Sequence, residues 1–521
     1  MKVLSTAEKR RLEARAVEEL GMPSIVLMEN AAREVTDVVE RDLAPGGRVC
    51  VLCGPGNNGG DGLGVARHLA LRGRDVTCWL AVPADRLKGD ARTQYAICRR
   101  GGVPVSEATP GEIAAWLRAR VDGPDVIVDA LFGTGLSRPL EGEWVELVEA
   151  LDVEGREVVA VDLPSGLMGD GASPVGPFVT ASRTVALAAP QPAHVLWPVR
   201  GAVGDLWVAD LGLPPRLLEE AAPAFETLEP ARLAALLPQR GPEAHKGTAG
   251  HLLVWAGSPG KAGAAVLAAR AAGRLGAGLV SVACPETVQP TVAAGTFESM
   301  TLALPEVAEG SGDGPASLAD RIVEHAGERS ALAAGPGLGT NAAIQESIRA
   351  VVARCPVPMV LDADTLNAFA GRLGELADRR APAVLTPHPG ELGRLLERSA
   401  AEVQADRLAA ARQAAQRSRA VVVLKGRGTL IAAPEGGVEL CLEGGPALAT
   451  GGSGDVLTGM IGALLAQGLE PRDAACLGVW LHARTGDRLA AQRGVLSLLA
   501  GDLVEELPAS VRELEERSTW P

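Results

Sequence analysis

The residues with the clearest potential for chemistry lie in a glycine-rich segment, GPGNNGGDG, at positions 54–62. The segment directly follows a hydrophobic stretch typical of a strand and directly precedes a helical pattern. Glycine allows the backbone to approach a ligand closely, and the N–H groups at a helix start attract phosphate. Asn57, Asn58 and Asp61 add side-chain donors and acceptors that a plain turn does not need. The segment predicts a phosphate or dinucleotide site, with a tight strand-to-helix turn as the alternative.

Two further strand-like stretches end in polar loops. VIVDALFGTGLSRPLEG places Asp129 at a strand end, and VVAVDLPSGL ends with Asp162 and Ser165. Because ligands of an open parallel sheet bind outside the carboxyl ends of its strands, we expect the three loops to converge on one crevice. Oxygen atoms of Asn58, Asp129 and Ser165 would suit a hard cation. For a single aspartate, a helix cap or a loop-stabilising role explains the residue equally well.

A second glycine turn, GGSGD at 451–455, opens a later helix. Backbone N–H groups at such a turn form an anion hole, and Asp455 could accept a proton from a hydroxyl as phosphate arrives. The pentapeptide alone fits a simple helix cap as well as a phosphoryl-transfer site.

Three companion segments favour the phosphoryl-transfer interpretation. LKGRGT at 424–429 supplies a Lys, an Arg and a Thr suited to nucleotide phosphates. TPHPGEL at 386–392 ends another strand with His388 and Glu391, and AAGPGLGT at 333–340 is a further glycine loop. A lone histidine is more often structural than catalytic, but we expect His388 to face the same crevice.

Hydrophobic runs alternate with helical patterns along the chain, which predicts an α/β protein with parallel sheets and crossover helices. A proline-rich stretch near residue 220 predicts a boundary between two domains, 1–220 and 221–521. The predicted strands are 48–53, 75–80, 125–129, 157–162 and 183–187 in the first domain, and 251–258, 279–284, 331–334, 359–362, 383–386, 420–424 and 429–433 in the second.

Composition narrows the class of protein. The 521 residues are 47% hydrophobic and 22% charged, which excludes disorder over most of the chain. The net charge of −14 opposes binding to nucleic acid or to an anionic bilayer. We find neither an export signal nor a spanning segment, and the eight scattered cysteines fit a reducing cytoplasmic location. Cys50 and Cys53 are expected to be buried strand residues on opposite faces rather than a redox or metal pair.

The motifs NNGGDG, VDALFGTGL and DLPSGL, in this order, resemble the YjeF N-terminal domain family, the NAD(P)H-hydrate epimerases, over residues 1 to about 215. The resemblance implies a Rossmann-like domain that interconverts the R and S forms of NAD(P)H hydrate, with K⁺ held by Asn58, Asp129 and Ser165. Loss of the ring hydroxyl would leave a cation, and we expect Asp162 to be the catalytic carboxylate that stabilises this cation or carries the proton. The implied substrate contacts are Asn57, Asn58, Gly59, Gly60, Asp61, Gly133, Thr134, Gly135, Leu136, Ser137, Arg138, Pro139, Glu143 and Asp162.

The segments HKGTAGHLLVWAGS, GPGLG, LDADTLN, TPHPGEL, KGRGT and GGSGDVLTGMIGALL resemble the NAD(P)H-hydrate dehydratases of the ribokinase-like superfamily, over residues 245 to about 507. The resemblance implies phosphorylation of the S hydrate by ADP with Mg²⁺, followed by loss of phosphate, and a homo-oligomer of four or more copies. Asp455 would be the catalytic base. The implied hydrate-binding residues are Gly337, His388, Glu391 and Asp455, and the nucleotide-binding residues are Lys425, Gly426, Arg427, Gly428, Thr429, Gly451, Gly452, Ser453 and Gly454.

The leading hypothesis is a bifunctional repair enzyme for hydrated nicotinamide cofactors. One alternative is a ribokinase-like kinase of a vitamin precursor, with the first domain as a regulator. A third hypothesis makes the first domain a non-catalytic dinucleotide sensor or scaffold, because a fold does not fix a function.

Overall fold

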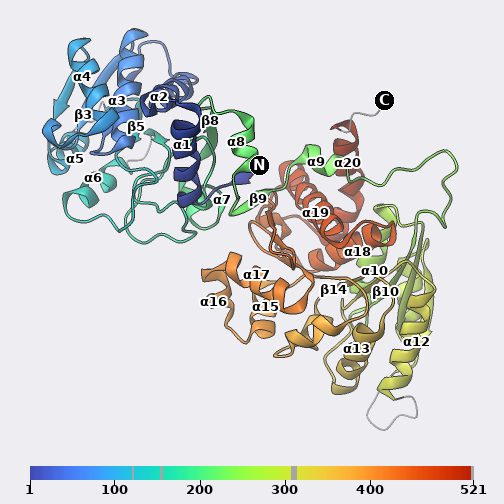
Figure 1. Cartoon of the computed structure of the whole chain (residues 1–521). Helices are drawn as coiled ribbons and strands as arrows, with labels where there is room; N and C mark the ends of the chain where they lie inside the picture. The colour runs from blue at the N-terminus through green and yellow to red at the C-terminus, as the bar shows by residue number, and fades with distance from the viewer. Residues whose placement is uncertain (120–122, 153–155, 307–313, 518–521) are drawn as a thin grey trace. The chain divides into compact units, whose positions relative to one another are not determined.

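The computed structural model describes residues 1–119, 123–152, 156–306 and 314–517. Its contacts divide the chain into two compact units, Lys2–Phe225 and Glu226–Pro521 with Met1. Each unit is built on its own central sheet with helices packed around it (Figure 1). Within the described residues, no helix combines the length and apolar character that crossing a bilayer requires.

The first unit has a seven-stranded parallel sheet in the order β4-β3-β2-β5-β6-β7-β8. The chain runs outward from β2 to β4 and then returns to β5 on the other side of β2, so a topological switch point lies between β2 and β5. The strands of this sheet are β2 (Arg48–Cys53), β3 (Asp75–Leu80), β4 (Val105–Glu107), β5 (Val126–Ala130), β6 (Glu157–Val161), β7 (Arg183–Leu187) and β8 (Asp205–Ala209). The two-residue strand β1 (Lys2–Val3) is not part of it.

Helices cover both faces of this sheet. Strand β2 shows the two faces, because Val51 and Cys53 belong to one apolar cluster while Cys50 and Leu52 belong to another. The predicted burial of both cysteines on opposite faces is therefore confirmed. The helices are α1 (Thr6–Leu20), α2 (Ser24–Glu40), α3 (Asn57–Leu71), α4 (Gly89–Arg100), α5 (Pro110–Arg118), α6 (Glu143–Leu151), α7 (Pro192–Val195) and α8 (Pro215–Glu220), with 3-10 turns at Ala84–Arg86 and Val199–Ala202.

The second unit has a larger sheet in the order β9-β18-β17-β16-β15-β14-β13-β10-β11-β12. Its switch point lies between β10 and β13, and the strands from β16 to β12 are parallel. The strands are β9 (Phe225–Thr227), β10 (His251–Trp255), β11 (Leu279–Pro285), β12 (Met300–Leu304), β13 (Ala331–Ala334), β14 (Met359–Leu361), β15 (Ala383–Leu385), β16 (Val421–Leu424), β17 (Leu430–Ala432) and β18 (Val438–Leu440).

The helices of the second unit build one core against this sheet, with α18 completely embedded beyond its first turn. They are α9 (Pro230–Ala234), α10 (Ala262–Arg274), α11 (Gln289–Gly295), α12 (Pro315–Gly327), α13 (Ala342–Arg354), α14 (Asp364–Asn367), α15 (Pro389–Leu396), α16 (Ala400–Ala405), α17 (Arg407–Ser418), α18 (Ser453–Ala466), α19 (Pro471–Arg493) and α20 (Ala500–Arg517), with 3-10 turns at Leu373–Asp378 and Pro446–Leu448.

The predicted α/β architecture is confirmed, and each predicted strand is present with ends that shift by at most a few residues. Two features depart from the expectation. Strands β16, β17 and β18 form an antiparallel meander at one side of an otherwise parallel sheet. Strands β1, β4, β8, β9, β12 and β18 were not predicted, because they are short or, like β8 and β12, lie at a sheet edge with most residues partly exposed.

Candidate active sites

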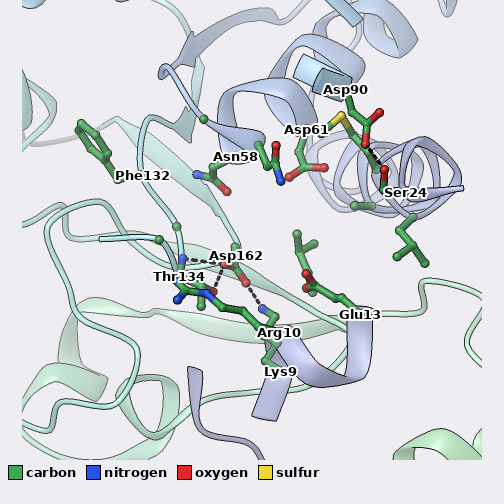
Figure 2. A pocket seen from close by; sticks show the side chains of 18 of the residues that line it. Lys9, Arg10, Glu13, Ser24, Asn58, Asp61, Asp90, Phe132, Thr134 and Asp162 are labelled. Carbon is green, nitrogen blue, oxygen red and sulfur yellow. Dashed lines mark hydrogen bonds and ion pairs between the residues drawn. The ribbon is translucent and has the colours of Figure 1, made fainter. Parts of the chain in front are cut away.

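The first site is a cavity of about 580 Å³ at the switch point of the first sheet (Figure 2). Its walls are the segments that follow β2, β5 and β6, together with helices α1 and α2. The helix α3 begins in this wall after Gly56, which offers no side chain to cap its first N–H groups. The predicted site residues that line the cavity are Asn57, Asn58, Asp61, Gly133, Thr134, Gly135, Leu136 and Asp162.

Other predicted residues of this set lie outside the cavity lining. A Cβ on Gly59 would stand 2.0 Å from the carbonyl oxygen of Gly54, so this glycine allows α3 to pack closely against the preceding loop. The Glu143 carboxylate accepts a 3.3 Å hydrogen bond from the backbone N–H of Gly111, which ties the start of α6 to α5. The residues outside the lining are Gly59, Gly60, Ser137, Arg138, Pro139 and Glu143.

Asp162 is the most constrained carboxylate of the cavity. It forms a buried ion pair with Lys9 and accepts hydrogen bonds from the backbone N–H and the hydroxyl of Thr134. Burial alone would raise the pKa of Asp162, but Lys9 and Thr134 outweigh burial and hold this pKa well below its usual range. Its backbone has a φ of 64°, a conformation that is costly for a residue with a Cβ. The site therefore holds Asp162 as an ionised carboxylate in a fixed orientation.

Lys9 is a site residue that the sequence interpretation missed. It is 2% exposed and lies on the buried side of α1 with Leu12 and Ala16. The spacing of these three residues places the lysine in the apolar stripe of an amphipathic helix. Since an unpaired lysine is almost never fully buried, its position in that stripe was the available signal for a buried acidic partner.

Two of the other carboxyl groups that line this cavity, those of Asp61 and Glu13, have raised pKa values. Asp61 is 6% exposed, and burial together with the charges of Asp162 and Glu13 raises its pKa well above the ordinary value. Burial also raises the pKa of Glu13, against the opposing effect of Lys9. The cavity thus contains one carboxyl group whose pKa is held low and two whose pKa values are raised.

Of the residues predicted to hold a cation, Asn58 lines this cavity, and Asp129 and Ser165 do not. Asp129 is fully buried, and its carboxylate accepts hydrogen bonds from the Ser165 hydroxyl at 2.6 Å and the Ser165 N–H at 2.8 Å. Burial raises the pKa of Asp129 to about 6, although these hydrogen bonds oppose the shift. No ion pair found in the described ranges includes Asp129, and the Asn58 amide nitrogen is buried without a partner. This oxygen-rich group with a buried uncompensated carboxylate fits a monovalent cation.

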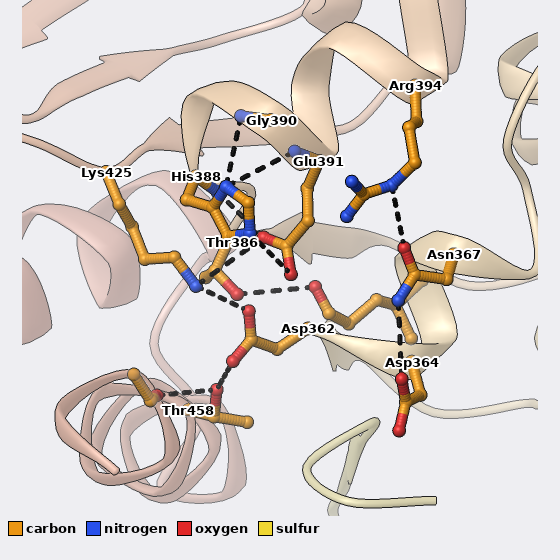
Figure 3. A network of polar contacts seen from close by, with 12 residues as sticks. Asp362, Asp364, Asn367, Thr386, His388, Gly390, Glu391, Arg394, Lys425 and Thr458 are labelled. Atoms are coloured by element: carbon orange, nitrogen blue, oxygen red, sulfur yellow. Dashed lines mark hydrogen bonds and ion pairs between the residues drawn. The ribbon is translucent and has the colours of Figure 1, made fainter. Parts of the chain in front are cut away.

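The second site lies at the carboxyl ends of β14, β15 and β16 (Figure 3). The Lys425 amine bonds to one carboxylate oxygen of Asp362 at 2.7 Å, and the Thr458 hydroxyl donates to the other at 2.9 Å. Asp362 is 2% exposed, and its carboxylate outweighs the effect of burial and raises the pKa of Lys425. Helix α18, which carries Thr458, is thereby fixed to the ends of two strands.

His388 and Glu391 form the start of α15. The ring Nδ1 of His388 accepts hydrogen bonds from the backbone N–H of Gly390 at 3.0 Å and of Glu391 at 3.3 Å, while Glu391 bonds back to the His388 N–H at 2.8 Å. This is a reciprocal capping box, and it gives His388 a structural role. Glu391 is also 3.9 Å from the Lys425 amine, so both residues lie beside the acidic network.

Asp455 lies in the first turn of α18 and faces this network. Burial and the neighbouring charge of Asp362 raise its pKa to about 6, while Lys425 opposes the shift. A carboxylate with such a pKa is ionised at neutral pH and still basic enough to accept a proton. Helix α18 begins after Gly452, whose φ of 91° places it in the left-handed region and which provides no side-chain cap. The uncapped N–H groups of α18 are available to an anion.

Gly337 lies in a loop that contacts Lys261 and Asp364, beside this site. A Cβ on Gly337 would come within 2.9 Å of the Cβ of Lys261, so the loop can approach α10 only with glycine there. Two residues further on, the Gly339 N–H donates to the Asp364 carboxylate at 2.8 Å, and the Lys261 amine is 3.4 Å from the same carboxylate. The charge of Asp364 in turn acts on Asp455.

A cavity of about 460 Å³ adjoins the network. Its walls are the turn between β16 and β17, the segment 443–450, the start of α18 and one side of α19. The buried ring nitrogen Nε2 of His482 is 3.0 Å from the Ser453 hydroxyl, and burial lowers the pKa of His482 to about 4. The predicted nucleotide-binding residues in this lining are Lys425, Gly426, Arg427, Thr429, Ser453 and Gly454; those outside it are Gly428, Gly451 and Gly452.

The sequence interpretation also missed Asp362, Thr458 and His482 as site residues. Asp362 directly follows β14, and the rule that selected Asp129 and Asp162 at strand ends would have selected it. Thr458 and His482 lie within buried helices, where the sequence offers little that separates a site residue from a core residue.

Two α/β units, each with an acidic site at the carboxyl edge of its sheet, define a two-domain enzyme. Residues 24–193 match the family described as YjeF-related protein N-terminus, and residues 252–509 match the family described as NAD(P)H-hydrate dehydratase. The two mainly parallel sheets with helices packed around them agree with the predicted Rossmann-like and ribokinase-like α/β classes.

Full-length relatives carry both units. The Bifunctional NAD(P)H-hydrate repair enzyme Nnr of Moorella thermoacetica is 42% identical over 99% of this chain and 98% of its own length. The enzyme of the same name from Thermofilum pendens is 39% identical over 99% and 97%. A solved ADP/ATP-dependent NAD(P)H-hydrate dehydratase from Bacillus subtilis, co-crystallized with ATP/Mg2+, is 31% identical with a TM-score of 0.48, covering 56% of this chain and 100% of that one. The chain belongs to the family of bifunctional NAD(P)H-hydrate repair enzymes.

Proposed function

We propose that the protein repairs hydrated nicotinamide cofactors. Residues 1–220 epimerise R- and S-NAD(P)H hydrate, and residues 221–521 dehydrate the S form to NAD(P)H with ADP as co-substrate, releasing AMP and phosphate. The observation that carries the proposal is the presence of both sites in one chain that aligns over 99% of its length with bifunctional repair enzymes.

The epimerase site has the charge that its reaction needs. When the hydroxyl leaves C6 of the reduced nicotinamide ring, the ring nitrogen takes on positive charge. Asp162 is ionised by its contact with Lys9 and can stabilise that cation. The uncapped start of α3 can bind the pyrophosphate of the dinucleotide.

The dehydratase site has the groups for a phosphoryl transfer. Asp455 accepts the proton of the ring hydroxyl as the hydroxyl attacks the terminal phosphate of ADP, and the start of α18 stabilises the charge that develops there. Phosphate is a better leaving group than hydroxide, so the ring nitrogen can then expel it. The nucleotide occupies the cavity beside His482 and the turn 425–429.

Two metal ions complete the proposal. Asn58, Asp129 and Ser165 would hold K⁺, which supplies the positive charge that the buried Asp129 carboxylate lacks. Mg²⁺ would accompany the phosphates of the nucleotide, where Asp362 and Asp455 offer nearby carboxylates. A cytoplasmic location and an assembly of four or more copies stay predictions.

The full-length match does not favour the kinase alternative, in which the first unit is only a regulator. The decisive experiment incubates the full chain with mixed epimers and either ADP or ATP and follows the recovery of reduced-cofactor absorbance. Consumption of both epimers requires both activities, and the nucleotide comparison identifies the phosphate donor. A stable phosphorylated hydrate without recovery of NAD(P)H would contradict the dehydratase and support the kinase.

A further inference from the structure

Four carboxyl groups line the epimerase cavity. Asp90 on α4 accepts a hydrogen bond from the Ser24 hydroxyl, and the other three come from three different elements. Asp162 follows β6, Asp61 lies on α3 and Glu13 lies on α1 (Figure 2). The inference drawn from them rests on the proposed epimerase function. Inversion at C6 requires a proton for the hydroxyl that leaves one face of the ring and a base for the water that adds to the other face.

Asp162 is poorly placed to transfer that proton. Its two carboxylate oxygens are engaged by the Lys9 amine and by the N–H and hydroxyl of Thr134. The Thr134 hydroxyl lies in addition 2.9 Å from the Gln191 side-chain oxygen. Protonation of Asp162 would leave Lys9, which is 2% exposed, as a buried charge without its partner.

Asp61 and Glu13 are placed differently. In the part of the chain that the structure describes, neither side chain forms a hydrogen bond or ion pair, and both line the cavity. The charged groups that act on Asp61 are Lys9 and Glu13 from α1, Asp90 from α4 and Asp162. Those that act on Glu13 are Lys9 and Arg10 from its own helix and Asp162. Burial raises the pKa of both groups; the neighbouring carboxylates add to this effect at Asp61, whereas Lys9 and Arg10 oppose it at Glu13.

We propose that Asp61 and Glu13 are the two proton-transferring residues of the epimerase, one acting from the α3 wall and the other from the α1 wall. One carboxyl group gives its proton to the C6 hydroxyl, the C–O bond breaks with its electron pair on oxygen, and water leaves. The ring nitrogen lone pair forms the C=N⁺ bond, beside the Asp162 carboxylate. A water molecule then adds to C6 from the other face, and the second carboxylate takes its proton. The reverse reaction exchanges the two roles, and proton exchange with water resets the pair.

The test separates removal of the hydroxyl from inversion. Each purified epimer is incubated with the full chain in H₂¹⁸O without ADP, and mass spectrometry of the separated epimers measures both ¹⁸O uptake and inversion. In Asp61→Asn or Glu13→Gln, one carboxyl group remains, on one face of the nicotinamide ring. The epimer whose hydroxyl lies on that face can still exchange this hydroxyl with solvent. We therefore expect the rate of inversion to fall by about 10²–10⁴-fold in each variant. One epimer should retain ¹⁸O uptake in Asp61→Asn, and the other epimer should retain it in Glu13→Gln.

Matched controls use the same chemical change at exposed positions. Glu18→Gln on α1 and Asp75→Asn at the start of β3 alter exposed carboxylates away from the cavity and should epimerise as the wild type does. ADP-dependent dehydration of the S hydrate by the second unit verifies the amount of each variant chain, and thermal unfolding of the first unit verifies that this unit is folded.

Three outcomes would overturn the proposal. If either variant retains full inversion, that residue is not a proton carrier. If both variants lose ¹⁸O uptake and inversion together in both epimers, the residues act on binding or structure. If the wild-type chain inverts the epimers no faster than the protein-free blank, the epimerase function itself is overturned, and with it this assignment.

Discussion

Lys9 and Asp162 form a buried ion pair although they lie 153 positions apart in the sequence. Their side chains are 2% and 8% exposed. The pair joins the amino-terminal helix α1 to the loop after β6, which would otherwise present a strained aspartate with a φ of 64° to the cavity. Helix α1 therefore forms part of the wall of the candidate site as well as part of the packing.

The first prediction concerns the stability of this pair. Lys9→Met should destabilise the first unit by about 3–5 kcal/mol, because the substitution leaves a buried carboxylate without its partner. Asp162→Asn should lower the free energy of unfolding by a similar amount, and the double variant should lower it by less than the sum of the two single effects. Urea unfolding of the full chain measures these differences. Because the pKa of Asp162 is depressed, the contribution of the pair is present above the unfolded value of about 3.9 and is lost as pH falls below it.

The surface pair on the same helix provides the control. Arg11 is 67% exposed and contacts Glu8, so Arg11→Met should change the free energy of unfolding by less than about 1 kcal/mol. Equal costs for Lys9→Met and Arg11→Met would contradict the structural role of the buried pair.

The second prediction concerns K⁺. Burial raises the pKa of Asp129 to about 6, so stability is lost as pH rises from the unfolded value of about 3.9 to about 6, by about 3 kcal/mol in all. Bound K⁺ should offset this cost. The thermal midpoint of the first unit should therefore rise with K⁺ at pH 8 and change much less at pH 5, where Asp129 is protonated.

Asp129→Asn tests the assignment of that effect. Removal of the carboxylate charge should make the effect of K⁺ on the thermal midpoint the same at pH 8 and pH 5. Choline chloride at equal ionic strength is the reference salt. A K⁺ effect of equal size in Asp129→Asn would place the cation elsewhere.

The third prediction concerns the pH dependence of dehydration. The pKa of Asp455 is about 6, so kcat/KM for the S hydrate should fall as pH decreases through about 6 and the carboxylate becomes protonated. Asp455→Asn should lower kcat by about 10²–10⁴-fold at all pH values and remove this inflection. A variant that retains the same inflection would assign the titration to another group.

The sequence predicted the elements that carry the sites better than it predicted the contacts within them. Strand β2 and the helix after it could be placed because glycines mark the turn between them, and Asp129 and Asp162 were selected because acids at parallel strand ends converge. The same rule applied to Asp362 would have found the centre of the second site. These successes depend on local patterns and on one general rule of parallel sheets.

Contacts between distant segments could not be predicted in this way. The partner of Lys9 is fixed by the packing of α1 near the end of β6, and no short-range pattern specifies that packing. The capping role of His388 depends on the rotamer of its ring, which a lone histidine between two prolines does not reveal. The roles assigned to Glu143 and to the glycines outside the cavities stay predictions.

The last prediction concerns the nucleotide cavity. Ala483 on α19 is 5% exposed, lines this cavity, and would lie 3.2 Å from a Cβ placed on Gly444. Ala483→Phe should fill part of the space of about 460 Å³ and raise the KM for ADP by tenfold or more, a loss of about 1.4 kcal/mol in binding. Ala483→Ser adds little volume and should keep a KM near that of the wild type. Epimerisation without ADP should be unchanged in both variants, because that site lies in the other unit. An unchanged KM in folded Ala483→Phe would place the nucleotide outside this cavity.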